Sequence, residues 1–257
     1  MNLFQSFGST LISPVLRRLG YIPKARPFSD YIAFKETLNG AAAAGLSVGE
    51  YIEQKNLTGT PSALDKTMDG LAALGVFDGP IERVCEVGPG SGRYLEKTIA
   101  RCKPHTYEIY ETSPEWRGWL IEKYGVVPKH CDGRTLAETE SSSVGLIQAH
   151  KVFHGLPLLV TLSYLREFAR VVRDGGWVVF DIMTEKCFSK EHLDQWFEAN
   201  PWEWPWAPHM CAFDFAIDLF AAQGIQLVGS FQIRNYPAVT ECIVLRKTKS
   251  DPGVGAE

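Results

Sequence analysis

The sequence has few of the features that mark metal-binding, secreted or membrane proteins. Its six cysteines form no C-x-x-C pair, and no Cys/His cluster has the spacing of a zinc site. No apolar run reaches the ~18 residues that a membrane span needs, and no basic segment precedes an apolar core as in a secretory signal. With a net charge of −4, the chain lacks the basic field that would recruit nucleic acid. These absences favour a cytoplasmic protein with no metal site, no transmembrane segment and no nucleic-acid partner.

What is present is one organising stretch, Ile81 to Leu95, with the sequence IERVCEVGPGSGRYL. An apolar run around Cys85 predicts a short buried strand. Gly88, Gly90 and Gly92 then predict a tight turn, and a helical pattern follows. Glycines are needed where the chain turns sharply and where its backbone approaches a ligand. The stretch therefore predicts a strand–turn–helix unit that binds a dinucleotide-like ligand, although an ordinary turn with glycines for packing is the alternative.

The spacing of the glycines distinguishes between ligands. A nicotinamide or flavin fingerprint has its third glycine three residues after the second, where this chain has Arg93. Glu86 stands two residues before the first glycine, where it would repel a pyrophosphate and attract a cationic amino group. The pattern E-x-G-x-G-x-G resembles motif I of the class I S-adenosylmethionine (SAM)-dependent methyltransferases. The resemblance implies that SAM is the cofactor and that Glu86, Gly88, Gly90 and Gly92 bind it.

Downstream, strand-like and helical segments alternate as in a parallel α/β fold. The expected strands lie near residues 82–87, 106–110, 126–127, 144–149, 177–182, 225–233 and 240–245. We therefore expect a Rossmann-like, mostly parallel seven-stranded sheet with helices on both faces. The resemblance to the methyltransferases covers Ile81 to Ile182 well and the last two strands loosely.

The pattern divides the chain into three parts. Residues 1–78 are predicted to form a helical cap on the substrate side, with no strand. Residues 79–248 are predicted to form the SAM-binding core, with an irregular aromatic-rich insertion at 187–210, and residues 249–257 a disordered tail. Within the cap, residues 3–19 have the spacing of an amphipathic helix. This helix would cover the core or a partner in a homo-oligomer, or else contact a membrane surface weakly.

Two further carboxylates are candidates for the cofactor site. Glu111 ends the second strand, near the ~20-residue spacing from the glycines of a residue that binds ribose hydroxyls. An ionised carboxylate can accept two hydroxyl protons at once, although a surface glutamate at a helix start is the alternative. Asp132 follows the third strand, where the methyltransferase resemblance implies a hydrogen bond from the adenine amino group, with Gly133 leaving room for the base. A plain turn is the alternative for Asp132 and Gly133.

His150 and His154 are the candidates for a catalytic base. Methyl transfer to a hydroxyl requires removal of a proton, and histidine has a suitable pKa of about 6.5. His150 lies at the carboxyl end of the fourth strand, the edge where ligands bind in open α/β sheets, and His154 follows shortly after. A structural role for both is the alternative. In that case proximity alone, or a tyrosine of the cap such as Tyr21 or Tyr31, is the next explanation of catalysis. Both tyrosines are also candidates for contact with the acceptor.

The aromatic-rich insertion is the candidate acceptor site. Four of the seven tryptophans crowd into it: Trp196, Trp202, Trp204 and Trp206. The insertion lies between the fifth strand and the last helix, so in this fold it would hang over the edge where the methyl group points. Flat rigid rings suit a sugar ring or an aromatic metabolite, and they would also suit a prenyl or acyl chain. The alternative is a lid whose rings are buried for stability alone.

Two missing motifs narrow the expected reaction. The chain has no N/D-P-P-Y/F motif of the amino methyltransferases that act on nucleic acids or glutamine, and no clear acidic triplet for a catalytic magnesium. We therefore expect a metal-independent enzyme that methylates a hydroxyl of a small-molecule acceptor, such as a sugar or a natural-product-like metabolite. N- or C-methylation of a small metabolite is one alternative. A SAM-fold protein that has lost catalysis and serves as a binding or scaffold subunit is the other.

Overall fold

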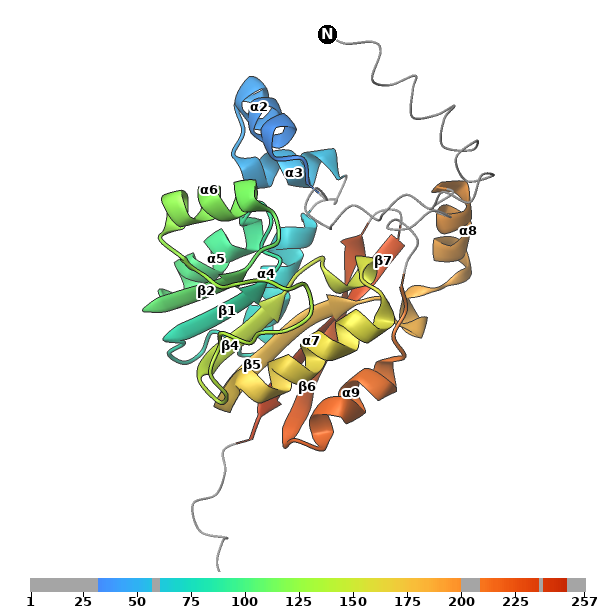
Figure 1. Cartoon of the computed structure of the whole chain (residues 1–257). Helices are drawn as coiled ribbons and strands as arrows, with labels where there is room; N and C mark the ends of the chain where they lie inside the picture. Colours follow the sequence, from blue (N-terminus) through green and yellow to red (C-terminus); the bar gives the residue numbers. More distant parts are fainter. Residues whose placement is uncertain (1–31, 57–60, 200–208, 236–237, 249–257) are drawn as a thin grey trace, which may run out of the picture. The chain divides into compact units, whose positions relative to one another are not determined.

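The computed structural model describes residues 32–56, 61–199, 209–235 and 238–248 (Figure 1). Several predictions fall outside these ranges. They concern the amphipathic segment 3–19, the tail 249–257, Tyr21, Tyr31, Trp202, Trp204 and Trp206. Among the helices that lie within the described ranges, none is long and apolar enough to cross a membrane.

The described residues contain a seven-stranded sheet in the order β3-β2-β1-β4-β5-β7-β6. Its strands are β1 (Arg83–Val87), β2 (Thr106–Tyr110), β3 (Val127–Pro128), β4 (Val144–Ala149), β5 (Val172–Ile182), β6 (Ile225–Asn235) and β7 (Ala238–Lys247). The pairs from β3 to β5 are parallel, whereas β7 runs antiparallel to both of its neighbours. The strand order reverses between β1 and β4, and a ligand-binding crevice is expected at such a point. The predicted Rossmann-like fold is confirmed.

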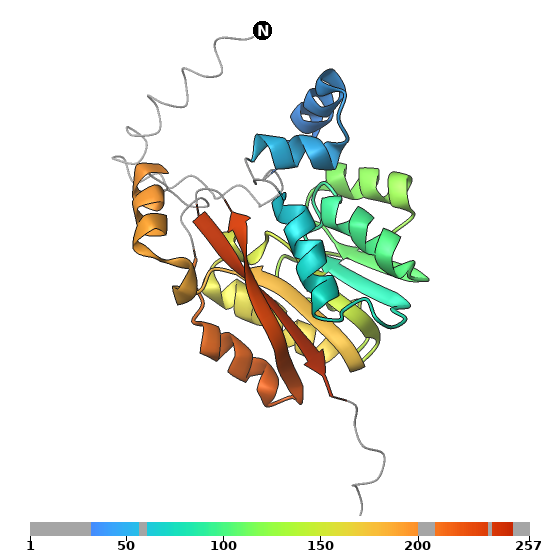
Figure 2. The same cartoon turned by 180° about the vertical axis from the view of Figure 1, so that it is seen from behind.

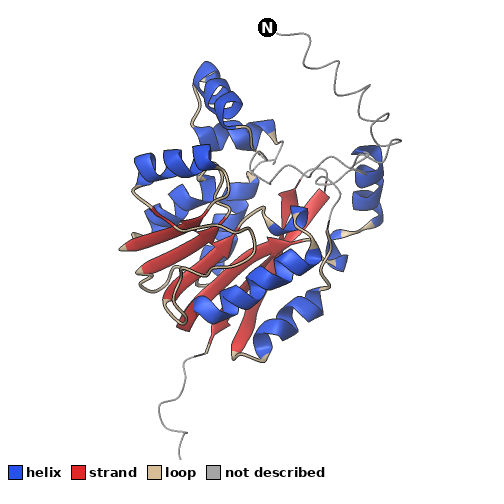
Figure 3. Ribbon diagram, in the orientation of Figure 1, coloured by secondary structure: helices blue, strands red, loops and turns tan. Residues whose placement is uncertain are grey.

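Helices cover both faces of this sheet (Figures 2 and 3). One face carries α4 (Ala63–Ala73), α5 (Arg93–Cys102) and α6 (Pro114–Tyr124), and the other carries α7 (Leu158–Val171) and α9 (Phe213–Ala221). In β1, Val84 packs in the hydrophobic core under α4, α5 and α6. Cys85 and Val87 pack in the core under α7 and α9, on the other face of the sheet. Successive strand residues point to opposite faces. Glu86 therefore lies on the same face as Val84, under α5.

Two N-terminal helices, α2 (Phe34–Ala44) and α3 (Val48–Lys55), precede α4. The Ser47 hydroxyl accepts a hydrogen bond from the Glu50 backbone N–H, and the Glu50 carboxylate accepts one from the Ser47 backbone N–H. This reciprocal pair is a capping box at the start of α3, and its sequence signature is a serine followed three residues later by a glutamate. Ser113 caps α6 in a similar way, accepting from the Trp116 backbone N–H. Local capping residues thus set where these helices begin.

The structure differs from the sequence-based expectation in two segments. The sequence predicts irregular structure at 187–210, but α8 (Lys190–Ala199) occupies part of it. Asp174, Gly175 and Gly176 have the composition of a tight turn before the expected strand 177–182, but these residues lie within β5. There the register between β4 and β5 shifts, and Gly175 has a φ of +71°. Glycine at the left-handed position lets β5 bend at a bulge and continue, instead of leaving the sheet.

Candidate active site

The three glycines after β1 all adopt the left-handed backbone conformation, with φ of +62° at Gly88, +51° at Gly90 and +74° at Gly92. Residues with a side chain rarely adopt it. A Cβ at Gly88 would lie 2.8 Å from Val152 Cγ2, and one at Gly92 would lie 2.5 Å from Leu120 Cδ2. The turn therefore needs glycine for two independent reasons. Its bare backbone suits the close approach of a cofactor, so the residues present fit SAM.

Glu111 joins the end of β2 to this glycine turn. Its carboxylate accepts 2.8 Å hydrogen bonds from the backbone N–H of Gly90 and from that of Ser113. Burial raises the pKa of Glu111, and the backbone hydrogen bonds oppose this effect. Each oxygen of an ionised carboxylate can accept a second hydrogen bond. The geometry is thus compatible with the expected ribose contact, which stays a prediction.

Glu86 lies in a buried polar network under α5. Its carboxylate accepts hydrogen bonds from the Tyr107 hydroxyl and, at 3.1 Å, from Gln148 Nε2. Gln148 Nε2 also contacts the Thr98 hydroxyl of α5 at 3.2 Å. Burial raises the pKa of Glu86 to about 7, although the hydrogen bonds from Tyr107 and Gln148 lower it. These hydrogen bonds connect Glu86 of β1 to the neighbouring strands β2 and β4. Its contact with the SAM amino group stays a prediction.

Asp132 makes its contacts within its own loop after β3. Its Oδ1 accepts backbone hydrogen bonds from Arg134 at 2.9 Å and from Thr135 at 2.7 Å, and its Oδ2 accepts one from the Thr135 hydroxyl. Gly133, with a φ of +82°, faces open space. The arrangement matches the plain-turn alternative, in which both carboxylate oxygens have local partners. The adenine contact of Asp132 and Gly133 stays a prediction.

The His150 ring is buried just beyond the end of β4. It stacks on Tyr94 of α5, with the ring centroids 4.3 Å apart and the planes at 19°. Neither ring nitrogen has a hydrogen-bond partner among the described residues. Burial lowers the pKa of His150 to about 4, although the Asp181 carboxylate opposes this shift. The ring is therefore neutral at pH 7. Buried polar atoms normally have a hydrogen-bond partner, so two unpartnered nitrogens make this ring a candidate for contact with a ligand.

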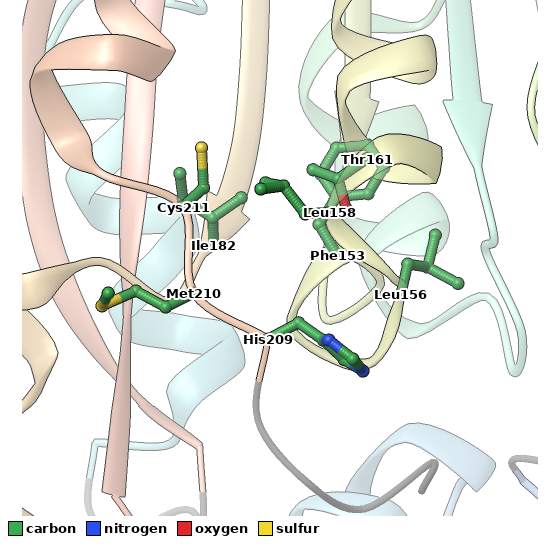
Figure 4. A pocket seen from close by; sticks show the side chains of 8 residues that line it. All are labelled: Phe153, Leu156, Leu158, Thr161, Ile182, His209, Met210 and Cys211. Atoms are coloured by element: carbon green, nitrogen blue, oxygen red, sulfur yellow. The ribbon is translucent and has the colours of Figure 1, made fainter.

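His154 lies in the short 3-10 helix η2 (Phe153–Gly155), and burial lowers its pKa to about 4 as well. Its carbonyl accepts a 3.1 Å hydrogen bond from the backbone N–H of His209. Figure 4 shows a cleft lined by its sequence neighbour Phe153 and by side chains of α7 on one side, and by Ile182 and Cys211 on the other. This cleft has no room for a water molecule. Because both ring nitrogens of His150 lack a partner among the described residues, His150 is the better candidate for a base.

Two buried charged residues near these histidines, Lys151 and Asp181, are not among the site residues predicted from the sequence. Asp181 in β5 is fully buried and accepts hydrogen bonds from the backbone N–H of Lys151 at 2.6 Å and from the Thr240 hydroxyl at 2.7 Å. The ammonium of Lys151 lies 3.5 Å from the same carboxylate. A signal exists in the sequence, because Asp181 interrupts the apolar run WVVFDI and Lys151 directly follows His150. Charged residues are rarely buried without a partner.

The N-terminal helices contact the first turns of α5 and α6. Arg93, the first residue of α5, forms an ion pair with Glu53 of α3, and both side chains are nearly buried. Trp116 of α6 donates a 2.7 Å hydrogen bond from Nε1 to the Ile32 carbonyl, and Phe34 packs edge-on against its ring. These contacts bring residues 32–55 next to the helix that follows the glycine turn. The partners lie 40 and 84 residues apart in the sequence, so local sequence patterns could not predict these contacts.

Trp196 of α8 packs in a small apolar cluster at the end of β5. Its side chain is buried against Met183 and Ala238, with Phe188 alongside. This position matches the alternative in which the ring serves stability. A contact with the acceptor stays a prediction for Trp196.

Comparisons with known proteins agree with this site. The model of the methyltransferase domain family matches residues 50–228. A search of curated proteins gives no match. The match to the family model covers well over half of the chain, so it shows the family directly.

Solved structures show the same fold at low sequence identity. The chain is similar to the N-methyltransferase NodS from Bradyrhizobium japonicum WM9 in complex with S-adenosyl-L-homocysteine (SAH), with a TM-score of 0.55, 14% identity and coverage of 83% of this chain and 97% of that one. It is similar to magnesium protoporphyrin IX methyltransferase (ChlM) from Synechocystis PCC 6803 with bound SAH, with a TM-score of 0.54, 11% identity and coverage of 93% and 96%. It is also similar to an O-methyltransferase family protein from Burkholderia thailandensis, with a TM-score of 0.54, 14% identity and coverage of 95% and 71%. The chain therefore belongs to the methyltransferase domain family and is a class I SAM-dependent methyltransferase.

Proposed function

We propose that this enzyme transfers the methyl group of SAM to a hydroxyl of a small-molecule acceptor, such as a sugar or a natural-product-like metabolite. The observation that supports this is the His150 ring, which is buried at the edge of β4 with both nitrogens unpartnered among the described residues. A hydroxyl is neutral at pH 7 and has to lose its proton as the methyl group arrives. A neutral imidazole at this end of β4 can accept that proton. Burial lowers the pKa of His150 to about 4, which keeps the ring unprotonated but makes it a weaker base than an exposed histidine.

The cofactor is assigned to the turn and the strand ends that motif I indicates. The proposed residues are Glu86, Gly88, Gly90, Gly92, Glu111, Asp132 and Gly133. When bound, SAM supplies a methyl group that is already activated as part of a sulfonium. The protein therefore has to orient the acceptor and take up its proton.

His150 is proposed to accept the acceptor proton on a ring nitrogen, while Tyr94 holds the plane of the imidazole by stacking. The negative charge of Asp181 would stabilise the imidazolium that forms. The tryptophans and the two cap tyrosines are proposed for the acceptor side: Trp196, Trp202, Trp204, Trp206, Tyr21 and Tyr31. His154 stays the second candidate for the base. Free cysteines suit a reducing compartment, so we place the enzyme in the cytoplasm.

A methyl-transfer screen tests the proposal. The full chain is incubated with SAM that carries an isotope-labelled methyl group and with a panel of sugars, glycosides, phenols and amines. Mass spectrometry and NMR then identify the methylated atom of any product. We expect an O-methyl product whose formation is lost in His150→Ala and kept in His105→Ala, a matched change at an exposed histidine. A product methylated at nitrogen or carbon would overturn transfer to a hydroxyl.

A further inference from the structure

We propose that Lys151 and Asp181 act as a positioning pair, which holds the turn between β4 and η2 so that His150 and Val152 keep their places beside the glycine turn. The inference rests on the proposed function, in which His150 takes the acceptor proton. Neither residue of the pair touches the reacting atoms in this scheme. Besides the charge effect of Asp181 on the imidazolium, the pair acts through the backbone of residues 150–152.

The backbone at Lys151 is strained. Its φ of +59° lies in the left-handed region. For a residue with a side chain, this conformation costs about 1–2 kcal/mol. Such strain persists only where the surroundings impose it, and it clusters at functional sites. Lys151 follows directly after His150, so the strain lies within the proposed active site.

Asp181 and its neighbours impose that conformation. Asp181 Oδ1 accepts a 2.6 Å hydrogen bond from the Lys151 backbone N–H, and Oδ2 lies 3.5 Å from Lys151 Nζ. The same ammonium donates to the Thr240 hydroxyl at 2.8 Å and to the Arg234 carbonyl at 3.0 Å. The lysine side chain thus reaches from the end of β4 past β5 and β7 to β6. It ties together the carboxyl edge of the sheet, where ligands bind in this fold.

The turn held in this way makes two contacts with the cofactor side of the molecule. His150 stacks on Tyr94, two residues beyond Gly92. Val152 Cγ2 occupies the place that a side chain at Gly88 would need. If the turn relaxed, both the imidazole and the wall beside Gly88 would move. The pair therefore links β5 to the geometry of the cofactor turn.

Stability alone does not explain a buried ion pair at this place. Removing two charges from water is expensive, and apolar residues of similar volume are often equally or more stable. The Asp181 side chain is fully buried and that of Lys151 is 10% exposed. Charged groups give what apolar residues cannot, namely directional bonds to a backbone N–H, a hydroxyl and a carbonyl at once. That directionality suits a turn whose conformation has to be fixed.

The test uses the double variant Lys151→Met with Asp181→Asn, which removes both charges while keeping similar side-chain volumes. The full-length protein is labelled at histidine carbons, and the imidazole resonances are recorded at pH 7 with and without SAH. We expect the variant to fold, with the His150 resonances shifted and those of exposed His105 unchanged. With an acceptor from the screen, turnover should fall about 10- to 100-fold, as misplaced catalytic groups do, with a smaller change in KM.

Unchanged His150 resonances in the folded double variant would overturn the proposal, and so would unchanged turnover. If the double variant does not fold, Thr240→Val replaces it, because this change removes the bridging hydroxyl and leaves both charges in place. It should shift the His150 resonances in the same way, and an unshifted spectrum would again refute positioning. The two proposals fail separately. Retained turnover in His150→Ala refutes the base, whereas the resonances report on positioning without any acceptor.

Discussion

The carboxylate of Glu111 accepts a 2.8 Å hydrogen bond from the backbone N–H of Gly90, so the end of β2 holds the turn that follows β1. The same carboxylate also accepts from the backbone N–H of Ser113 at the start of α6. One side chain thus fixes the relative positions of the two strand ends at the proposed cofactor site. Changes at Glu111 should therefore be read out in cofactor affinity.

Glu111→Ala should weaken SAH binding by about 1.5–3 kcal/mol, which corresponds to roughly 10- to 150-fold in Kd, the scale of hydrogen bonds to a charged group. Isothermal titration calorimetry measures the change. Glu115→Ala, at an exposed position four residues further along the chain, is the matched control and should leave Kd unchanged. An unaltered Kd in the Glu111 variant would remove this residue from the ribose role.

Gly92→Ala should destabilise the protein, because the alanine would be held at a φ of +74° with its Cβ 2.5 Å from Leu120 Cδ2. The left-handed conformation alone costs about 1–2 kcal/mol, and the overlap adds to it. Gly118→Ala in α6 is the matched control, since a Cβ there meets nothing within 4 Å. It should raise stability by about 0.5–1 kcal/mol. Urea unfolding measures the free energy of unfolding of both variants, which should fall in Gly92→Ala and rise in Gly118→Ala. Equal changes in the two variants would show that position 92 does not require glycine.

His150→Ala should lower turnover by ~10²–10⁴-fold while SAH still binds. Because burial lowers the pKa of His150 to about 4, the wild-type rate should persist well below pH 6.5 and fall only as the pH approaches about 4. An unperturbed histidine, with a pKa of about 6.5, would instead give a rate that falls below about pH 6.5. Rate profiles at saturating SAM test it. A limb that stays near pH 6.5 would mean that the ring becomes solvated when the site is loaded.

The free energy of unfolding should depend on pH through buried groups whose pKa values shift in opposite directions on folding. His150 and His154 bind protons near pH 6.5 when unfolded but only near pH 4 when folded, so their contribution is lost as the pH falls through this window. The pKa of Glu86 is instead raised from 4.5 to about 7, so its contribution is lost as the pH rises through that range. His150→Gln should therefore flatten the loss of stability in acid, and Glu86→Gln should steepen it. Denaturant unfolding between pH 5 and pH 8 measures both slopes, and slopes equal to that of the wild type would contradict the burial of these groups.

Trp196→Ala should destabilise the protein by about 3–5 kcal/mol, the usual effect of removing a large buried aromatic ring. The reason is its burial against Met183 and Ala238. Thermal unfolding measures the change, with Leu159→Ala as the control, since that side chain is 80% exposed. A normal melting temperature combined with a raised acceptor KM would favour the alternative, in which the ring lines the acceptor pocket.

The sequence by itself determined the features that depend on neighbouring residues. The glycines of E-x-G-x-G-x-G predict a turn with left-handed backbone, and all three glycines have positive φ. The strand and helix periods predict the Rossmann-like sheet, and Ser47 and Ser113, residues of a type that favours helix starts, cap two helices. These inferences succeed because backbone sterics, capping and alternation act over a few residues.

The tertiary structure alone decided how the polar side chains are paired. Glu86 contacts Gln148 and Tyr107 because both lie on the same face of adjacent strands. His150 stacks on Tyr94, and Asp181 reaches the backbone of Lys151 across the edge of the sheet. The partners lie on different strands and helices, 21 to 62 residues apart in the hydrogen-bonded cases. A buried charge takes the partner that the fold brings within reach, so its role follows from strand order and register.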